Sequence, residues 1–387
     1  LTADRGPASN SLAVFQSFTP WRPSTSANES AIILAALENS ELTYEKKNEL
    51  NIGVALGFVD NRINVEFDWY RRNNFDLIGY TQTMGVGGVT TKLANDATME
   101  STGCEFTIST TNIKTKDFKW TTDWIFGWAE NTITKLDSRS QVYSLVNGVG
   151  RTEGRPIGAL YSIPFAGLTE EGLPTFYIDA EHTQVVGPGN YADIYFQEYE
   201  NIDYLKYEGT IDPKITGSFG NTFSWKGLKL NVFFTYSFGN VLRLDNLCPV
   251  YSSDYSDLTA SMKEMKNRWM VPGDENVTTI PSIPTVRQMR EIDALNNAYS
   301  AYNYSTERVA KGDFIRLKEL SLAYDLPKKY FEGQNAVSSF GVKLSATNLW
   351  LAYADKKLNG RDPEYYNTGG VSSPVPRQFT LTVKLGF

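Results

Sequence analysis

The sequence has few of the residues on which most enzymes depend. It contains one histidine, His182, and two cysteines, Cys104 and Cys248, with no metal-ligand spacing between them. His182 stands among charged and polar residues, which is typical of a solvated loop position. We therefore predict that the protein is not an enzyme, and we expect no catalytic residue, metal site, cofactor or disulfide framework.

Long apolar runs and an excess of positive charge are also missing. No stretch approaches the roughly 18 consecutive apolar residues of a membrane-spanning helix, which excludes a helical membrane protein. The formal net charge of -7 argues against a nucleic-acid partner, because such a partner requires a basic face. No signal-peptide pattern follows Leu1, so we expect a mature chain or a fragment of a longer protein.

Aromatic residues, in contrast, are abundant. The chain contains 8 Trp, 22 Tyr and 21 Phe, although its mean hydropathy is only -0.34. A soluble protein of this polarity seldom needs so many large rings. A transmembrane β-barrel does, because it places rings on its lipid face and at both membrane interfaces while its lumen stays polar.

The last ten residues alternate strictly between polar and apolar side chains and end on Phe387. Successive side chains of a strand point to opposite faces, so Phe379, Leu381 and Val383 belong to one apolar stripe. The same period predicts nine strands, with residues 11–18 as a tenth candidate. The nine are residues 49–58, 62–70, 103–113, 118–130, 215–225, 228–238, 314–324, 340–348 and 378–387.

Charge follows the same alternation. Lys229, Lys343 and Lys384 all fall on the polar phase of their strands. This placement favours a lipid-facing stripe, since lysine on the lipid face costs roughly 2–4 kcal/mol at the bilayer midplane. Between residues 314 and 324 the phase changes, which predicts a β-bulge near Lys318-Glu319.

The connections between these strands alternate in length. Short or medium ones are expected at residues 59–61, 114–117, 226–227 and 325–337, and long ones at 71–102, 131–214, 239–313 and 349–377. Outer-membrane barrels have short periplasmic turns and long extracellular loops. The fold class predicted is therefore all-β, a transmembrane antiparallel β-barrel with about nine or ten strands in this chain.

The predicted long loop at residues 131–214 is rich in tyrosine and acidic residues. Exposed rings can stack on sugars or pack against peptide side chains, and a carboxylate can bind hydroxyls or basic groups. The candidate substrate-binding residues are Tyr161, Tyr191, Tyr195, Tyr199 and Asp193. The alternative is that these rings only pack the loop against its neighbours or against a partner protein. In the next long loop, residues 252–269 have helical spacing of apolar residues.

Several distinct motifs follow one another between residues 39 and 387. The most specific are Arg268-Trp269-x-x-Pro272-Gly273-Asp274, Gly312-Asp313-Phe314-Ile315-Arg316-Leu317-Lys318 and Gly360-Arg361-Asp362-Pro363-Glu364. We interpret the first and last as motifs that shape their loops. Together the motifs resemble the C-terminal part of SusC-like TonB-dependent transporters, the SusC/RagA family of Bacteroidetes. One segment, Ser101-Thr102-Gly103-Cys104-Glu105, departs from the family's usual Asn-x-Gly-x-Glu.

This resemblance implies a 22-stranded barrel in the whole protein, with an N-terminal plug and further N-terminal segments that are absent from this sequence. It implies TonB-dependent import of oligosaccharides or oligopeptides across the outer membrane of a Gram-negative cell. The implied partners are a SusD-like surface lipoprotein, the TonB-ExbB-ExbD complex acting through the plug, and the lipid bilayer. A dimer of transporter–lipoprotein pairs is also implied. Phe387 would be the terminal aromatic residue read by the barrel-assembly machinery.

Two other functions remain open at this point. A passive porin or surface receptor could use the same barrel, and a plug with a TonB box upstream of Leu1 would exclude it. A soluble carbohydrate-binding β module is the second alternative, and it predicts a protein that stays soluble and monomeric without detergent.

Overall fold

The structure of the chain is a computed structural model. It describes residues 2–4, 12–18, 31–85, 89–247, 263–327, 330, 337–366 and 376–386. Phe387, Cys248 and residues 252–262 of the predicted helix lie outside the described residues.

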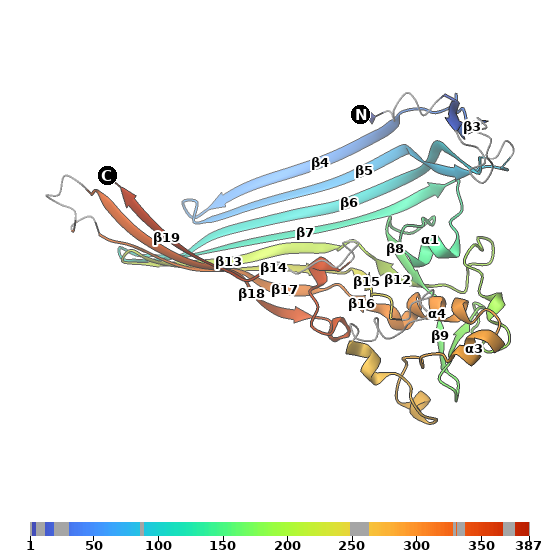
Figure 1. Cartoon of the computed structure of the whole chain (residues 1–387). Coiled ribbons are helices and arrows are strands. Elements are labelled where there is room, and N and C mark those ends of the chain that lie inside the picture. The colour runs from blue at the N-terminus through green and yellow to red at the C-terminus, as the bar shows by residue number, and fades with distance from the viewer. Residues whose placement is uncertain are drawn as a thin grey trace.

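One large antiparallel sheet dominates the described part of the chain (Figure 1). Its ten strands follow the order β1-β4-β5-β6-β7-β13-β14-β17-β18-β19. Nine of them are the strands that the alternation predicts. They are β4 (Glu45–Phe58), β5 (Ile63–Gln82), β6 (Thr91–Lys114), β7 (Phe118–Leu136), β13 (Ile215–Trp225), β14 (Leu228–Phe238), β17 (Phe314–Asp325), β18 (Ser339–Ala354) and β19 (Gln378–Gly386).

The tenth strand is not the one predicted. Residues 14–18 of the candidate 11–18 form β2 (Val14–Phe18), which pairs with β3 (Ala31–Ala36) in a separate hairpin. The sheet instead continues from β4 to the short β1 (Thr2–Asp4). Period-2 alternation predicts that a segment is a strand, but it carries no information about which strand the segment pairs with.

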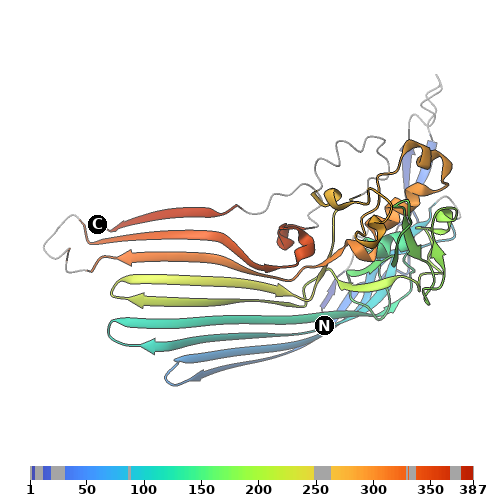
Figure 2. The ribbon, with the colours of Figure 1, turned by 90° about the horizontal axis from the view of Figure 1, so that it is seen from below.

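The short connections lie together at one end of the sheet, and the C-terminus lies at the same end (Figures 1 and 2). Lys226 and Gly227 join β13 to β14 with φ values of 45° and 87°. Positive φ at both central residues is the tight hairpin turn whose twist matches that of the strands. The long connections emerge at the opposite end, as predicted from their alternation along the chain.

The two faces of the sheet differ in chemistry. Leu50, Leu344 and Leu381 belong to the apolar phase and are exposed, and no protein layer covers them among the described residues. Gly53, Lys343 and Thr380 belong to the opposite, polar phase. An exposed apolar face of this extent is what a lipid-facing wall requires and what a water-soluble surface avoids.

Polar side chains on the apolar face hydrogen-bond to one another. Asn221 accepts from Trp120 Nε1 at 2.9 Å and from Thr122 Oγ1 at 2.7 Å. Asn112 in turn donates to Thr122 at 2.7 Å, and Thr110 donates to Asn112 at 2.8 Å. Because each polar group has a partner within the sheet, this cluster does not depend on water for its hydrogen bonds.

The predicted β-bulge is confirmed. On β17, Glu319 faces Phe233 of β14 and Leu317 faces Phe234, so Lys318 is the extra residue. The pairing of β17 with β18 shifts at the same place. The insertion returns Leu320 and the following apolar residues to the apolar face.

The strands extend much further than the alternation predicts. The predicted loop 71–102 is wrong in its bounds, because β5 continues to Gln82 and β6 begins at Thr91. The connection between them covers only residues 83–90. In this extension both faces of the hairpin carry polar residues such as Arg72 and Asn73, so backbone pairing continues while the apolar signal is lost. Residues 131–136 and 349–354 likewise belong to β7 and β18.

The long connections fold into a compact unit that we call the loop domain, residues 137–214, 239–247 and 263–313 (Figure 1). Its strands are β8 (Ala159–Ser162), β9 (Phe165–Leu168), β10 (Pro174–Tyr177), β11 (Val185–Val186), β12 (Lys206–Thr210), β15 (Val241–Arg243) and β16 (Val309–Lys311). Its α-helices are α1 (Val142–Val146), α3 (Val286–Glu291) and α4 (Leu295–Asn303). The 3-10 helices are η2 (Tyr191–Asp193), η3 (Lys263–Asn267), η4 (Asp274–Asn276) and η5 (Thr306–Arg308).

The loop domain has a hydrophobic core of its own. Leu145 from α1, Phe176 from β10 and Tyr302 from α4 are all buried in it. Met265, in η3, is the described end of the predicted helix 252–269 and is buried in the same core. The predicted loops 131–214 and 239–313 therefore fold against each other. Among the described residues, no helix is both long and apolar enough to span a membrane.

Candidate functional site

Two of the predicted substrate-binding residues are buried in the loop-domain core. Tyr191 is 0% exposed, and its hydroxyl donates to the carbonyl of Pro174 at 2.8 Å. Burial raises the pKa of the Tyr191 phenol well above its ordinary value. Tyr161 is buried as well and packs against Tyr207 with ring centroids 5.5 Å apart. Both rings pack inside the core, which favours the packing alternative for these two residues.

The other three predicted residues lie on the surface. Tyr195 and Tyr199 are 58% and 42% exposed, and Asp193 is exposed at the end of η2. The carboxylate of Glu198 accepts hydrogen bonds from the backbone N–H groups of Tyr199 at 2.9 Å and Glu200 at 2.7 Å. These backbone hydrogen bonds lower the pKa of Glu198, so the carboxylate is ionised near neutral pH and fixes the turn.

This turn is attached to helix α1. The backbone N–H of Val142 donates to the carbonyl of Glu198 at 2.8 Å, and that of Tyr143 donates to the carbonyl of Phe196 at 2.9 Å. Tyr143 itself is exposed beside the turn, and its ring contacts Tyr304 edge-on at 6.1 Å. We did not predict Tyr143 as a site residue. The sequence does contain a signal for the exposure of Tyr143. Val142, Leu145 and Val146 have the spacing of one helix face, which directs residue 143 outward.

A partly buried arginine, Arg243, holds three parts of the loop domain together. Arg243 of β15 donates to the carbonyls of Tyr161 at 2.5 Å, Ser305 at 2.9 Å and Val146 at 3.2 Å. Burial lowers the pKa of Arg243 to about 10, so it remains cationic at neutral pH. One side chain therefore ties together β8, the end of α1 and the turn after α4.

Two of the family-like motifs meet through an ion-pair cluster. Arg316 of β17 is buried and pairs with Asp362, and its Nε lies 2.8 Å from Glu364. Asp362 also accepts from the backbone N–H of Glu364 at 3.1 Å, at the start of η8 (Pro363–Tyr365). These ion pairs attach the loop after β18 to the sheet. They account for the arginine in one motif and the two carboxylates in the other.

The third motif shapes its loop, as interpreted from the sequence. Asp274 accepts from the backbone N–H groups of Met270 at 2.9 Å and Val271 at 3.0 Å, and Gly273 has a φ of 104°. The Trp269 ring lies against Gly172, where an added Cβ would come within 2.4 Å of the ring. Gly172 and Trp269 thus bring the two long loops into direct contact.

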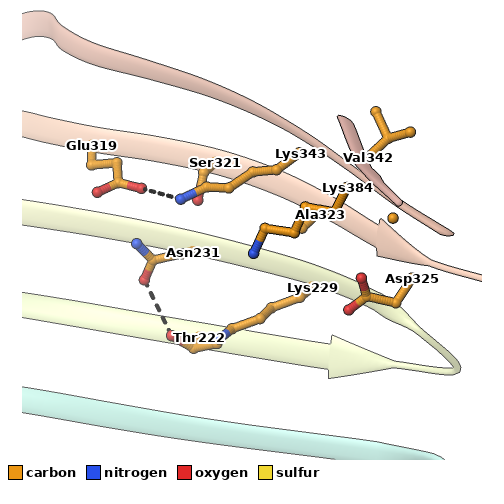
Figure 3. A pocket seen from close by; sticks show the side chains of 11 residues that line it. Thr222, Lys229, Asn231, Glu319, Ser321, Ala323, Asp325, Val342, Lys343 and Lys384 are labelled. Atoms are coloured by element: carbon orange, nitrogen blue, oxygen red, sulfur yellow. Dashed lines mark hydrogen bonds and ion pairs between the residues drawn. The ribbon is translucent and has the colours of Figure 1, made fainter. Parts of the chain in front are cut away.

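A hollow of 510 Å³ lies on the polar face of the sheet, close to its short-turn end (Figure 3). Its lining residues are Thr222, Lys229, Asn231, Glu319, Ser321, Ala323, Asp325, Gly341, Val342, Lys343 and Lys384. Lys343 pairs with Glu319 at 3.2 Å, and Thr222 donates to Asn231 at 3.1 Å. Within the described part of the chain, no group of three His, Cys, Asp or Glu side chains is placed to hold a metal ion.

Comparisons with known proteins relate the chain to TonB-dependent receptors. TonB-dependent receptor P3 of Formosa agariphila is 27% identical over 385 residues, which cover 92% of this chain and 35% of that receptor. TonB-dependent receptor SusC of Bacteroides thetaiotaomicron is 34% identical over 99 residues, or 25% of this chain and 10% of SusC. The chain spans about a third of the length of the curated relatives that it matches along most of its sequence. No protein-family model matches the chain.

Solved structures show the same fold. The RagAB peptide transporter superposes with a TM-score of 0.73 at 24% identity, covering 98% of this chain and 38% of the transporter chain. The RagAB peptide importer in its closed-closed state gives 0.71 at 25% identity over 98% and 39% of the two chains. These findings confirm the resemblance predicted from the motifs and the predicted barrel fold class.

Proposed function

We propose that this chain is part of a SusC-like TonB-dependent transporter and that it forms one side of an outer-membrane barrel that imports oligomeric nutrients. The observation that carries this proposal is the sheet itself, whose apolar face is exposed over many strands while its polar face is lined with lysine, asparagine and threonine. Such a sheet suits a wall between lipid and an aqueous interior. In this orientation the short turns lie in the periplasm and the loop domain lies outside the cell.

The names of the relatives support part of the proposed set of partners. RagAB is named as a peptide transporter, and SusC is named as a TonB-dependent receptor. We propose that this protein works with a SusD-like surface lipoprotein, assembles as a dimer of such pairs, and takes its energy from TonB-ExbB-ExbD through a plug. The loop domain would form the mouth of the barrel and the contact with the lipoprotein.

The proposed ligand-contacting residues are Tyr195, Tyr199 and Asp193, with Tyr143 beside them. Glu198 fixes the turn that carries the two tyrosines, so their rings are presented without a large entropic cost on binding. Exposed tyrosines can stack on a sugar ring or pack against a peptide side chain. For the substrate class we propose an oligopeptide first, because the RagAB structures match 98% of the chain, and an oligosaccharide second.

The test is uptake by cells that produce the full-length protein. Fluorescent oligopeptides and oligosaccharides would be offered with and without a protonophore, in cells with and without TonB. We expect uptake of one class only, abolished by the protonophore and by loss of TonB. Energy-independent uptake would instead support the passive porin, and failure to take up either class would contradict import.

Two variants and one control test the site. Tyr195→Ala and Tyr199→Ala should each weaken ligand binding by about 5–30-fold, equivalent to about 1–2 kcal/mol for a lost aromatic contact. Tyr80→Ala, at an exposed tyrosine of β5 outside the loop domain, is the control and should leave binding unchanged. Equal binding by all three variants would remove these tyrosines from the site.

A further inference from the structure

We propose that the hollow on the polar face is a carboxylate-binding site in the interior of the barrel. This inference rests on the proposed function, because it takes the polar face to be the inner one. The residues that line the hollow belong to β13, β14, β17, β18 and β19, whereas Tyr195 and Tyr199 belong to the loop domain, so the hollow is a separate site.

The hollow is open because small residues form its floor. Ala323 of β17 and Gly341 of β18 lie between the longer side chains, and an added Cβ at Gly341 would lie 2.5 Å from a carboxylate oxygen of Asp325. Lys229 and Lys343 face Ala323 from the strands on either side. Lys384 of β19 lies opposite Gly341, three strand spacings from Lys229, which is about 14 Å at the backbone. Two extended lysine side chains can therefore reach one group between them.

The charges of the lining are unbalanced. Three lysines and two carboxylates line the hollow, which leaves a net charge of +1. Lys343 pairs with Glu319, but Lys229 and Lys384 have no ion pair with any residue that the structure describes. Figure 3 shows both side chains extending along the hollow. A carboxylate is the group that two ammonium groups and the nearby amide of Asn231 would bind, through charge-assisted hydrogen bonds.

A carboxylate could come from two sources. One is an acidic side chain of the same protein that sits inside the barrel, and the other is an acidic group on the imported molecule. Both have the same chemistry at the site. They differ in whether the site is filled permanently or only when cargo is present.

The experiment uses the purified full-length protein and the double variant Lys229→Gln/Lys384→Gln. The control is Lys114→Gln/Lys119→Gln, which removes the same charge from the facing pair at the end of β6 and β7 outside the hollow. Binding of hexaglutamate and hexaglutamine peptides is measured by calorimetry, and unfolding is followed with temperature.

If the carboxylate belongs to the cargo, the double variant loses at least about tenfold in hexaglutamate affinity, while hexaglutamine binding and the melting temperature are unchanged. If it belongs to the protein, the double variant has a lower melting temperature than the control, with unchanged peptide affinity. The proposal is overturned if the double variant behaves as the control does in both measurements. That result would leave TonB-dependent uptake intact, so it is distinguishable from failure of the proposed function.

Discussion

In the sheet Leu381 is 67% exposed and Phe379 is 70% exposed, whereas in the loop domain Leu145 is 1% exposed and Phe176 is 0% exposed. The residue types are the same, but among the described residues no protein core covers the apolar face of the sheet, whereas the loop domain has a core of its own. The apolar face of the sheet is therefore suited to contact with lipid rather than with water. The loop domain is built as an ordinary water-exposed protein, with rings inside and charges outside.

The difference predicts that the two regions respond to different substitutions. Tyr191→Ala should destabilise the loop domain by about 3–5 kcal/mol, because it leaves a large cavity in a closed core. Tyr195→Ala, four residues later on the surface, should change stability by less than about 0.5 kcal/mol. Hydrogen exchange followed by mass spectrometry would report loss of protection in loop-domain peptides and not in β17 or β18. Equal effects of the two variants would contradict the assignment of Tyr191 to the core.

The corresponding substitution in the sheet places a charged side chain on its apolar face. Val383→Lys should cost about 2–4 kcal/mol if residue 383 faces the bilayer, and should reduce the amount of folded barrel in the outer membrane. Thr380→Lys is the matched control, because residue 380 is on the polar face opposite Ser345. Thr382 is less suitable, since it lies opposite Lys343 and a second lysine would repel it. Heat-modifiability on gels measures folded barrel, and equal yields from the two variants would argue against the assigned faces.

Alkaline pH should also affect the stability of the loop domain and of the sheet differently. Burial raises the pKa of Tyr204, in the loop domain, to about 12. An unfolded tyrosine has a pKa near 10, so the stabilising neutral phenol contributes fully below about pH 10 and its contribution is lost as the pH rises toward 12. The loss should reach about 2 kcal/mol at pH 12.

Tyr204→Phe provides the control for this pH dependence. The variant should unfold with a flatter dependence on pH between 10 and 12, as measured by protease sensitivity of the loop domain. An unchanged slope would show that other groups cause the alkaline effect.

The smallest expected effect concerns a polar group on the apolar face. The Tyr236 hydroxyl accepts from Trp124 Nε1 and donates to the carbonyl of Ile125, both at 2.9 Å, above Gly217. Tyr236→Phe should cost about 1 kcal/mol, since it leaves Trp124 Nε1 without that partner where water is scarce. Tyr199→Phe, on the loop-domain surface, should cost nothing measurable in chemical denaturation. A larger loss at Tyr199 would reverse the expected order.

The sheet could be predicted from the sequence because its signal is local. Each strand repeats the same alternation, and even the extra residue at Lys318 shifts the phase visibly. The signal ends where both strand faces become polar, so the alternation predicts a loop for residues 71–82 of β5 and 91–102 of β6. Strand prediction from alternation thus detects a one-sided environment rather than the strand itself.

The loop domain could not be predicted in the same way. Tyr191 and Tyr195 look alike in sequence, and only the fold decides that one packs under Pro174 and the other faces outward. The pairing of Arg316 with Asp362 joins residues 46 positions apart, beyond the reach of any periodic pattern. The motifs containing these residues were recognisable, but their connection was not.

The central claim, that odd-numbered residues of β19 face lipid and even-numbered residues face an aqueous interior, can be measured directly. Spin labels would be placed singly at residues 379, 380, 381, 382 and 383 of the full-length protein in bilayers, and their collisions with oxygen and with a water-soluble nickel chelate compared. We expect oxygen to dominate at 379, 381 and 383, and the chelate to dominate at 380 and 382. The same accessibility at all five positions would contradict a sheet with one face in the membrane.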